Sequence, residues 1–154
     1  MPCKVVGIAD GDTLTARCGK KPAERIRLTE IDAPEMGQPF GRRAKESLSG
    51  MCYGKQATLK RQKNPDEYGR TLARVYCNGA DAGAEQVRRG MAWVYERYAT
   101  DRSLYALQKE AQRAKRGLWA QKNPVPPWEY RRKENTKNGG KPEDRFRLRS
   151  TATT

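Results

Sequence analysis

The segment VVGIADGDTLTA, residues 5–16, predicts a β-hairpin at the start of the chain. Two short apolar runs, 5–8 and 13–16, flank the dipeptide Asp10-Gly11. Glycine accepts the positive φ that a tight hairpin turn requires, so Asp-Gly between two strand-like runs is a strong hairpin signal. The hairpin would place the acidic side chain of Asp12 at the tip of a strand pair.

The rest of the chain predicts an α+β domain with a mainly β core of about five strands and three helices. Its 154 residues suffice for one domain with an ordinary core. After residue 120 the composition becomes Pro-containing, polar and basic, which predicts a domain over 1–120 and a flexible tail over 121–154. Alternating or β-rich runs predict the other strands at 25–28, 57–60 and 71–76, and helical spacing with capping residues predicts helices at 41–49, 82–89 and about 101–116.

The charge balance indicates a polyanionic partner. The chain carries 32 Lys and Arg against 18 Asp and Glu, a formal net charge of +14, and the excess is spread over body and tail. Nucleic acid is therefore favoured over an anionic membrane surface. No apolar run approaches the roughly 20 residues needed to cross a bilayer, so we expect no membrane partner.

The chain contains no histidine, which excludes His-dependent nucleophile triads and His-metal nucleases. Acid–base chemistry must then come from carboxylates, Tyr, Lys, Cys or metal-bound water. Asp12, Asp32 and Glu35 follow predicted strands, and together they would form an all-oxygen site suited to Ca²⁺ or Mg²⁺. Taken singly, Asp12 is better explained as a turn former, and Asp32 and Glu35 as solvated loop charges. Arg27 and Arg70 would supply the planar, always-charged groups that bind phosphate oxygens.

Several motifs, in the same order along the chain, resemble the staphylococcal nuclease (thermonuclease-like) family. The resemblance covers about residues 4–120. The matching blocks are Asp10-Gly11-Asp12-Thr13, the run from Arg27 to Glu35, the run from Asp66 to Ala73, the run from Val87 to Ala92, and Gly117-Leu118-Trp119.

The resemblance implies a five-stranded OB-fold Greek-key barrel with three α-helices, and Ca²⁺-dependent endonuclease cleavage of DNA and RNA. It implies Ca²⁺ ligands at the side chains of Asp12 and Asp32 and the backbone carbonyl of Ala33. Glu35 would be the general base or the carboxylate that orients the attacking water. Arg27 and Arg70 would clamp the phosphate, Tyr68 would contact a terminal phosphate, and a nucleotide-stacking tyrosine would be Tyr95 or Tyr98.

The sequence departs from the family pattern at two places. Glu67 stands where the first-described member has Lys, so Lys63 or Arg61 nearby would supply that phosphate contact. The segment between Glu35 and Gly41 is shorter than that member's Lys-rich loop, which would leave the site more open. For the tyrosines of the 93–98 segment, the alternative is that they simply belong to the core.

The four cysteines predict two disulfides. A turn centred on Asp10-Gly11 places Cys3 directly across the hairpin from Cys18, and Cys52 and Cys77 bracket the second strand pair. Disulfides would imply a periplasmic or secreted protein with a processed leader. The alternative is four small buried thiols in a cytoplasmic protein.

Two non-enzymatic functions compete with the nuclease, which we expect to be monomeric. An OB-fold module that holds single strands by charge and stacking would have the same fold and charge. Such a binder has no use for three carboxylates in a phosphate groove, because their charge repels the ligand unless a metal lies between them. An architectural protein acting through the basic tail is the third possibility, and truncation after Trp119 should abolish its function.

Overall fold

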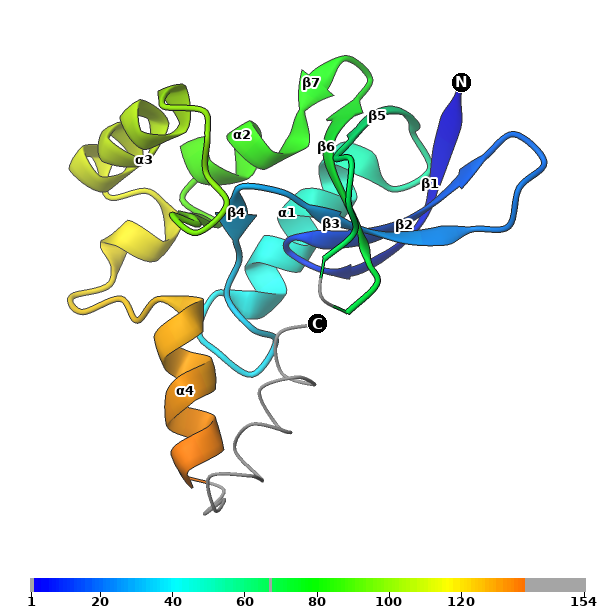
Figure 1. Cartoon of the computed structure of the whole chain (residues 1–154). Helices are drawn as coiled ribbons and strands as arrows, with labels where there is room; N and C mark the ends of the chain where they lie inside the picture. The colour runs from blue at the N-terminus through cyan, green and yellow to red at the C-terminus, as the bar shows by residue number, and fades with distance from the viewer. Residues whose placement is uncertain (1, 67, 138–154) are drawn as a thin grey trace.

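A computed structural model describes residues 2–66 and 68–137. The chain folds into a small barrel with helices packed on one side and a last helix beside the loop between β4 and α1 (Figure 1). In chain order the elements are β1 (Cys3–Asp10), β2 (Thr13–Cys18), β3 (Glu24–Leu28), β4 (Ile31–Asp32), α1 (Gly41–Cys52), β5 (Gln56–Arg61), β6 (Thr71–Cys77), β7 (Ala80–Asp81), α2 (Ala82–Arg88), β8 (Trp93–Val94), α3 (Ser103–Ala114), the 3-10 turn η1 (Gly117–Ala120) and α4 (Pro127–Lys137).

Five strands form a closed barrel, which confirms the predicted OB-type fold. The strand order is β3-β2-β1-β5-β6, and a parallel pairing of β3 with β6 closes the circle. The eight-residue strand β1 pairs with both β2 and β5, and its register shifts at two points against β2. Such irregularities bend and coil a strand, which lets one long strand serve both sides of a small barrel. The short strands β4 and β8 form a separate antiparallel pair beside it.

The core fills the barrel and the space between it and the helices. Inward side chains of the strands meet Leu48 of α1 and Val87 of α2, and all are inaccessible to solvent or nearly so. Apolar burial on this scale is the main force holding the barrel and helices together. The largest buried apolar side chains of the strands are Val5, Leu14, Ile26, Leu28, Ile31 and Val75.

Both predicted disulfides are present. Cys3 and Cys18 are directly opposite each other in the β1–β2 ladder, as the turn centred on Asp10-Gly11 predicts. Cys52 lies at the end of α1 rather than on a strand, so its bond to Cys77 ties α1 to the end of β6. The described residues contain no free cysteine.

The three predicted helices are found with shifted ends, and a fourth helix was not predicted. α1 continues to Cys52, whereas α3 is shorter than expected at both ends. α4 starts at Pro127, a residue well suited to the first helical position because its missing N–H would be unpaired there anyway. Residues 138–154 of the predicted tail lie outside the described residues. No helix within residues 2–66 and 68–137 has the length and apolar character of a membrane span.

Candidate active site

The turn between β1 and β2 presents Asp12 from a tightly packed position. A Cβ on Gly11 would lie 2.6 Å from the Cβ of Ala44 and 2.7 Å from that of Ala33, so only glycine allows this approach. The backbone N–H of Asp12 donates to Asp10 Oδ1 over 3.0 Å. The turn is therefore pressed against α1 and the segment after β4, which fixes the direction of the Asp12 side chain.

Buried Gln86 on α2 reinforces this turn. Its Nε2 donates to the carbonyl oxygens of Gly11 and Ala44, each over 2.9 Å. The side chain is inaccessible to solvent. One amide group thus holds the β1–β2 turn against α1, immediately before Asp12.

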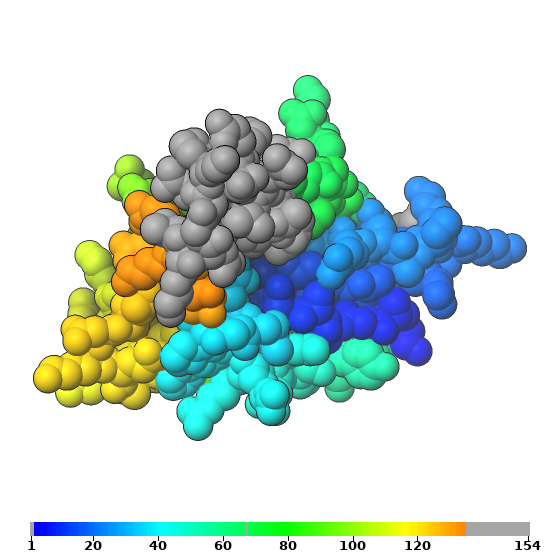
Figure 2. All heavy atoms as spheres, turned by 90° about the horizontal axis from the view of Figure 1, so that it is seen from below, coloured from blue at the N-terminus to red at the C-terminus, as the bar shows by residue number. Residues whose placement is uncertain are grey.

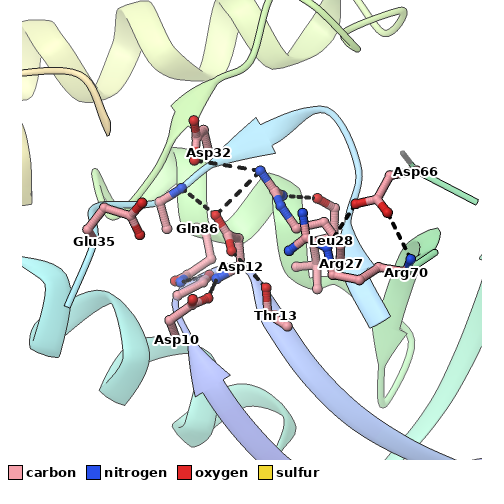
Figure 3. Close-up of polar contacts among 12 residues, drawn as sticks. Asp10, Asp12, Thr13, Arg27, Leu28, Asp32, Glu35, Asp66, Arg70 and Gln86 are labelled. Atoms are coloured by element: carbon pink, nitrogen blue, oxygen red, sulfur yellow. Dashed lines mark hydrogen bonds and ion pairs between the residues drawn. The ribbon is translucent and has the colours of Figure 1, made fainter. Parts of the chain in front are cut away.

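The strand β4 and the residues after it bring the second carboxylate to the first. The N–H of Ala33 donates to Asp12 Oδ2 over 2.8 Å, and Thr13 Oγ1 donates to Asp12 Oδ1. Asp32 is almost completely buried beside them. Figure 3 shows Arg27 reaching from β3 between the two acids, with its Nη2 3.6 Å from an oxygen of Asp12 and of Asp32.

Glu35 lies on the other side of Asp12 from Arg27 (Figure 3). Its backbone N–H donates to Gln38 Oε1 over 3.1 Å. Its carbonyl oxygen packs so closely on Gly41 that a Cβ there would be 2.0 Å away. The tight loop between β4 and α1 therefore holds a third carboxylate, 24% exposed, at the edge of the Asp12–Asp32 pair.

The surroundings shift the pKa values of the four acids of the site in different directions. Burial disfavours charge on Asp12, but the guanidinium of Arg27 and several hydrogen bonds outweigh it and lower the pKa of this carboxyl. Burial raises the pKa of Asp32 and of Glu35 above the ordinary values despite neighbouring arginines. Burial and the charge of Asp12 raise the pKa of Asp10 to about 8. A further positive charge would therefore stabilise the ionised form of these carboxylates.

A small open pocket shares Arg27 with this group of acids. Arg70 extends into the pocket from the residue before β6. Asp66 holds the Arg70 side chain in place, since Arg70 Nε donates to Asp66 Oδ2 over 2.8 Å. Asp66 Oδ1 also accepts the backbone N–H groups of Tyr68 and Arg70, which shapes the turn. The lining residues are Arg27, Asp66, Tyr68, Arg70, Leu72, Tyr95, Arg97, Tyr98 and Arg131.

Most of the predicted site residues are thus neighbours in space. Tyr95 and Tyr98 both line the pocket, in edge-to-face contact with ring centroids 5.3 Å apart, and both are only partly buried. Neither belongs to the buried core cluster, which also excludes Trp93. Lys63 is exposed on the β5–β6 loop and is not among the pocket's lining residues. Glu67 lies outside the described residues.

Sequence reasoning missed four residues of the site. The sequence predicts Asp10 as a turn residue within the family motif but assigns it no role in the site. Gln86 carries no signal in the sequence because its two acceptors lie 75 and 42 residues away. Arg97 and Arg131 line the pocket. Arg131 was assigned to the tail, although the aromatic pair Trp128 and Tyr130 just before it was a sign of a packed segment.

The donor set fits a hard divalent cation. Within residues 2–66 and 68–137, no group of three or more acidic or thiol side chains lies close enough together to hold a metal ion. The candidate ligands implied by the family resemblance are the carboxylates of Asp12 and Asp32 and the carbonyl oxygen of Ala33. The guanidinium groups of Arg27 and Arg131 already pair with these carboxylates. Arg131 Nη2 is 2.8 Å from Asp32 Oδ2 and its Nη1 is 3.1 Å from Glu35 Oε1. Oxygen donors of this kind suit Ca²⁺.

The structure thus shows an OB-type barrel with acids and arginines gathered at one rim. The family of staphylococcal nuclease homologues matches residues 25–121, and the chain belongs to that family. It is similar to an uncharacterized endonuclease of Haemophilus influenzae, with 45% identity over 132 residues, or 86% of this chain and 74% of that protein. It is 44% identical to an uncharacterized endonuclease of Escherichia coli, covering 85% of each chain. A micrococcal nuclease of Shigella flexneri is 39% identical over 140 residues, or 84% of this chain and 79% of that one. These relatives support an endonuclease.

Proposed function

We propose that the protein is a Ca²⁺-dependent, sugar-non-specific endonuclease that hydrolyses DNA and RNA and leaves 3′-phosphate ends. The observation that carries the proposal is a chain of ion pairs at the edge of the pocket. Asp12 and Asp32 share Arg27, Asp32 and Glu35 share Arg131, and both arginines line the pocket together with Arg70. A binding protein gains nothing from three acids beside a phosphate pocket. A hydrolase needs them, because a cation and a base must act next to the bound phosphate.

Asp12, Asp32 and the Ala33 carbonyl would hold the cation. When bound, the cation would neutralise charge on the scissile phosphate and polarise it. The buried pair Asp12–Asp32 is prearranged for this, since backbone and hydroxyl hydrogen bonds already orient Asp12.

Glu35 would accept a proton from the attacking water. Its partly exposed carboxylate lies at the mouth of the site, where water has access. A pKa raised by burial makes it a better base than an exposed glutamate. Arg27 and Arg70 would stabilise the charge that builds on the phosphate while the 5′-oxygen leaves. Without histidine, an arginine or water would protonate that oxygen.

The remaining pocket residues would bind the substrate. Tyr68 would contact a terminal phosphate, and Tyr95 and Tyr98 offer aromatic faces for a base. Lys63, exposed on the neighbouring loop, would add a phosphate contact outside the pocket. The two disulfides support a periplasmic or secreted location, and we expect the enzyme to act as a monomer.

The test is incubation with plasmid, single-stranded DNA and RNA in Ca²⁺, with EGTA as the control. We expect Ca²⁺-dependent cleavage of all three, and loss of cleavage in Asp12→Asn. Product ends blocked to polymerase extension until phosphatase treatment would identify 3′-phosphates. Tight binding of single strands with no metal-dependent loss of substrate would instead identify a binding module.

A further inference from the structure

The helix α4 is anchored on the active site, although it lies beyond the residues that match the family. The ring of Trp128 stacks on Tyr95 with centroids 5.6 Å apart and an interplanar angle of 19°, and it meets Trp93 edge-on at 5.7 Å. Gln38 Nε2 donates to the carbonyl oxygen of Val125, just before the helix. Figure 2 shows α4 (orange) directly against the segment that carries Glu35 (cyan).

This docking delivers one guanidinium into the carboxylate cluster. Arg131 donates to both oxygens of Asp32, over 2.8 and 3.3 Å, and to Glu35 over 3.1 Å. Its side chain is only 12% exposed. The two acids that it binds are a proposed metal ligand and the proposed base.

We infer that Arg131 is an internal cation that occupies the carboxylate site when no divalent cation is bound, and that the divalent cation must displace it. The inference rests on the proposed metal site. Both oxygens of Asp32 are engaged by the same fork of N–H groups, so a cation that takes either oxygen competes with a hydrogen bond. Two like charges on one buried carboxylate also repel each other strongly, because the surroundings screen them poorly.

Arg131 rather than Arg27 is the group that can leave. Arg27 belongs to a barrel strand, and its Nη1 also donates to the carbonyl oxygen of Leu28, so it is held by the barrel itself. Arg131 comes from a helix joined to the body by residues 121–126, which form neither helix nor strand. Its position depends on the contacts of Trp128 with Tyr95 and Trp93, on the hydrogen bond from Gln38 to Val125, and on the ion pairs themselves.

The experiment compares Ca²⁺ affinity, measured by calorimetry without substrate, in the full chain and in Arg131→Gln. We expect the variant to bind Ca²⁺ about fivefold more tightly or better, the range of typical coupling between competing sites. Lys133→Gln removes the same charge from an exposed position of α4 and should change the affinity less than twofold. Equal or weaker binding by Arg131→Gln would overturn the inference.

Two further readouts do not depend on that single variant. Trp128→Ala loosens the helix without touching an acid, and we expect tighter Ca²⁺ binding there as well. In EDTA, Arg131→Gln should melt at a lower temperature than the wild type, because Asp32 and Glu35 lose a positive partner. Adding Ca²⁺ should raise the melting temperature of the variant by more than it raises that of the wild type. An unchanged melting temperature in EDTA would contradict an occupying role.

The outcomes separate this inference from the proposed function. If wild type and Arg131→Gln bind Ca²⁺ equally and Asp12→Asn binds none, the metal site stands and the displacement by Arg131 is wrong. If neither the wild type nor Arg131→Gln binds Ca²⁺, the metal site and the inference fail together.

Discussion

The buried amide of Gln86 offers the most direct test of how the fold positions Asp12. Gln86→Met keeps the approximate length of the side chain and replaces its polar amide group by an apolar, unbranched end. The change deletes two hydrogen bonds, to the carbonyl oxygens of Gly11 and Ala44. Gly11 precedes Asp12, so the loss acts on the turn that carries this carboxylate.

The size of the effect follows from the contacts. Each lost hydrogen bond costs about 1–1.5 kcal/mol, giving about 2–3 kcal/mol for two. The variant also removes Gln86 Oε1, a buried acceptor without a hydrogen-bond partner among the described residues, which returns about 1 kcal/mol. We expect the free energy of unfolding to fall by about 1–2 kcal/mol. A turn that shifts by a fraction of an ångström should lower nuclease activity by about 10–100-fold.

The assay is urea denaturation at pH 7 together with Ca²⁺-dependent cleavage of single-stranded DNA at saturating Ca²⁺. Gln112→Met, on the exposed side of α3, makes the same chemical change away from any site and should leave both quantities within error. Activity that stays normal in Gln86→Met while stability falls would show that Asp12 is positioned without Gln86. Unchanged stability would refute the hydrogen-bond argument itself.

Four other predictions concern the proposed base and phosphate clamp, the pH dependence of activity, Asp10, and the buried ion pair of Glu30 outside the site. Glu35→Gln and Arg70→Ala should each lower the cleavage rate by about 10²–10⁴-fold at saturating Ca²⁺. Since burial raises the pKa of Glu35, wild-type activity should rise with pH through that raised pKa towards an alkaline maximum, and a maximum near pH 6 would speak against this base. In metal-free protein, the raised pKa of Asp10 means that the folded state holds its proton more tightly than the unfolded state, so stability falls as the pH rises from about 4 to about 8. Asp10→Asn should remove this fall and stabilise the metal-free protein at pH 8 by about 1–3 kcal/mol. A pH–stability curve parallel to that of the wild type would exclude Asp10 as the source of the fall. Glu30→Gln should lower the free energy of unfolding at pH 7 by about 2 kcal/mol, because buried Glu30 accepts from Arg74 and from the Thr100 and Asp101 backbone. The hydrogen bonds lower the pKa of Glu30 against the effect of burial. The ionised side chain therefore adds to the free energy of unfolding above the ordinary pKa of glutamate, and this stabilisation is lost on acidification. The difference between variant and wild type in urea denaturation should therefore shrink at pH 3, and a constant difference would contradict the ion pair as its source.

Local patterns decided much of the β framework. Asp10-Gly11 set the register of the first hairpin, and with it the pairing of Cys3 and Cys18. The pairing of Cys52 with Cys77 also followed from the strand pattern, although Cys52 lies on a helix. Turn chemistry and side-chain alternation act between residues close in sequence, so they are visible without a structure.

By itself, then, the sequence determined the barrel class, the disulfides, and the identity of the acids and arginines that the family resemblance singles out. The tertiary structure alone decided which other groups join them. Gln86 reaches its acceptors across 75 and 42 residues, and α4 brings Arg131 to Asp32 across 99. α4 has no apolar stripe, because it docks through one aromatic ring and one charged fork rather than through a buried face. Contacts of that kind leave no periodic pattern in a sequence, since they depend on how distant elements meet in space.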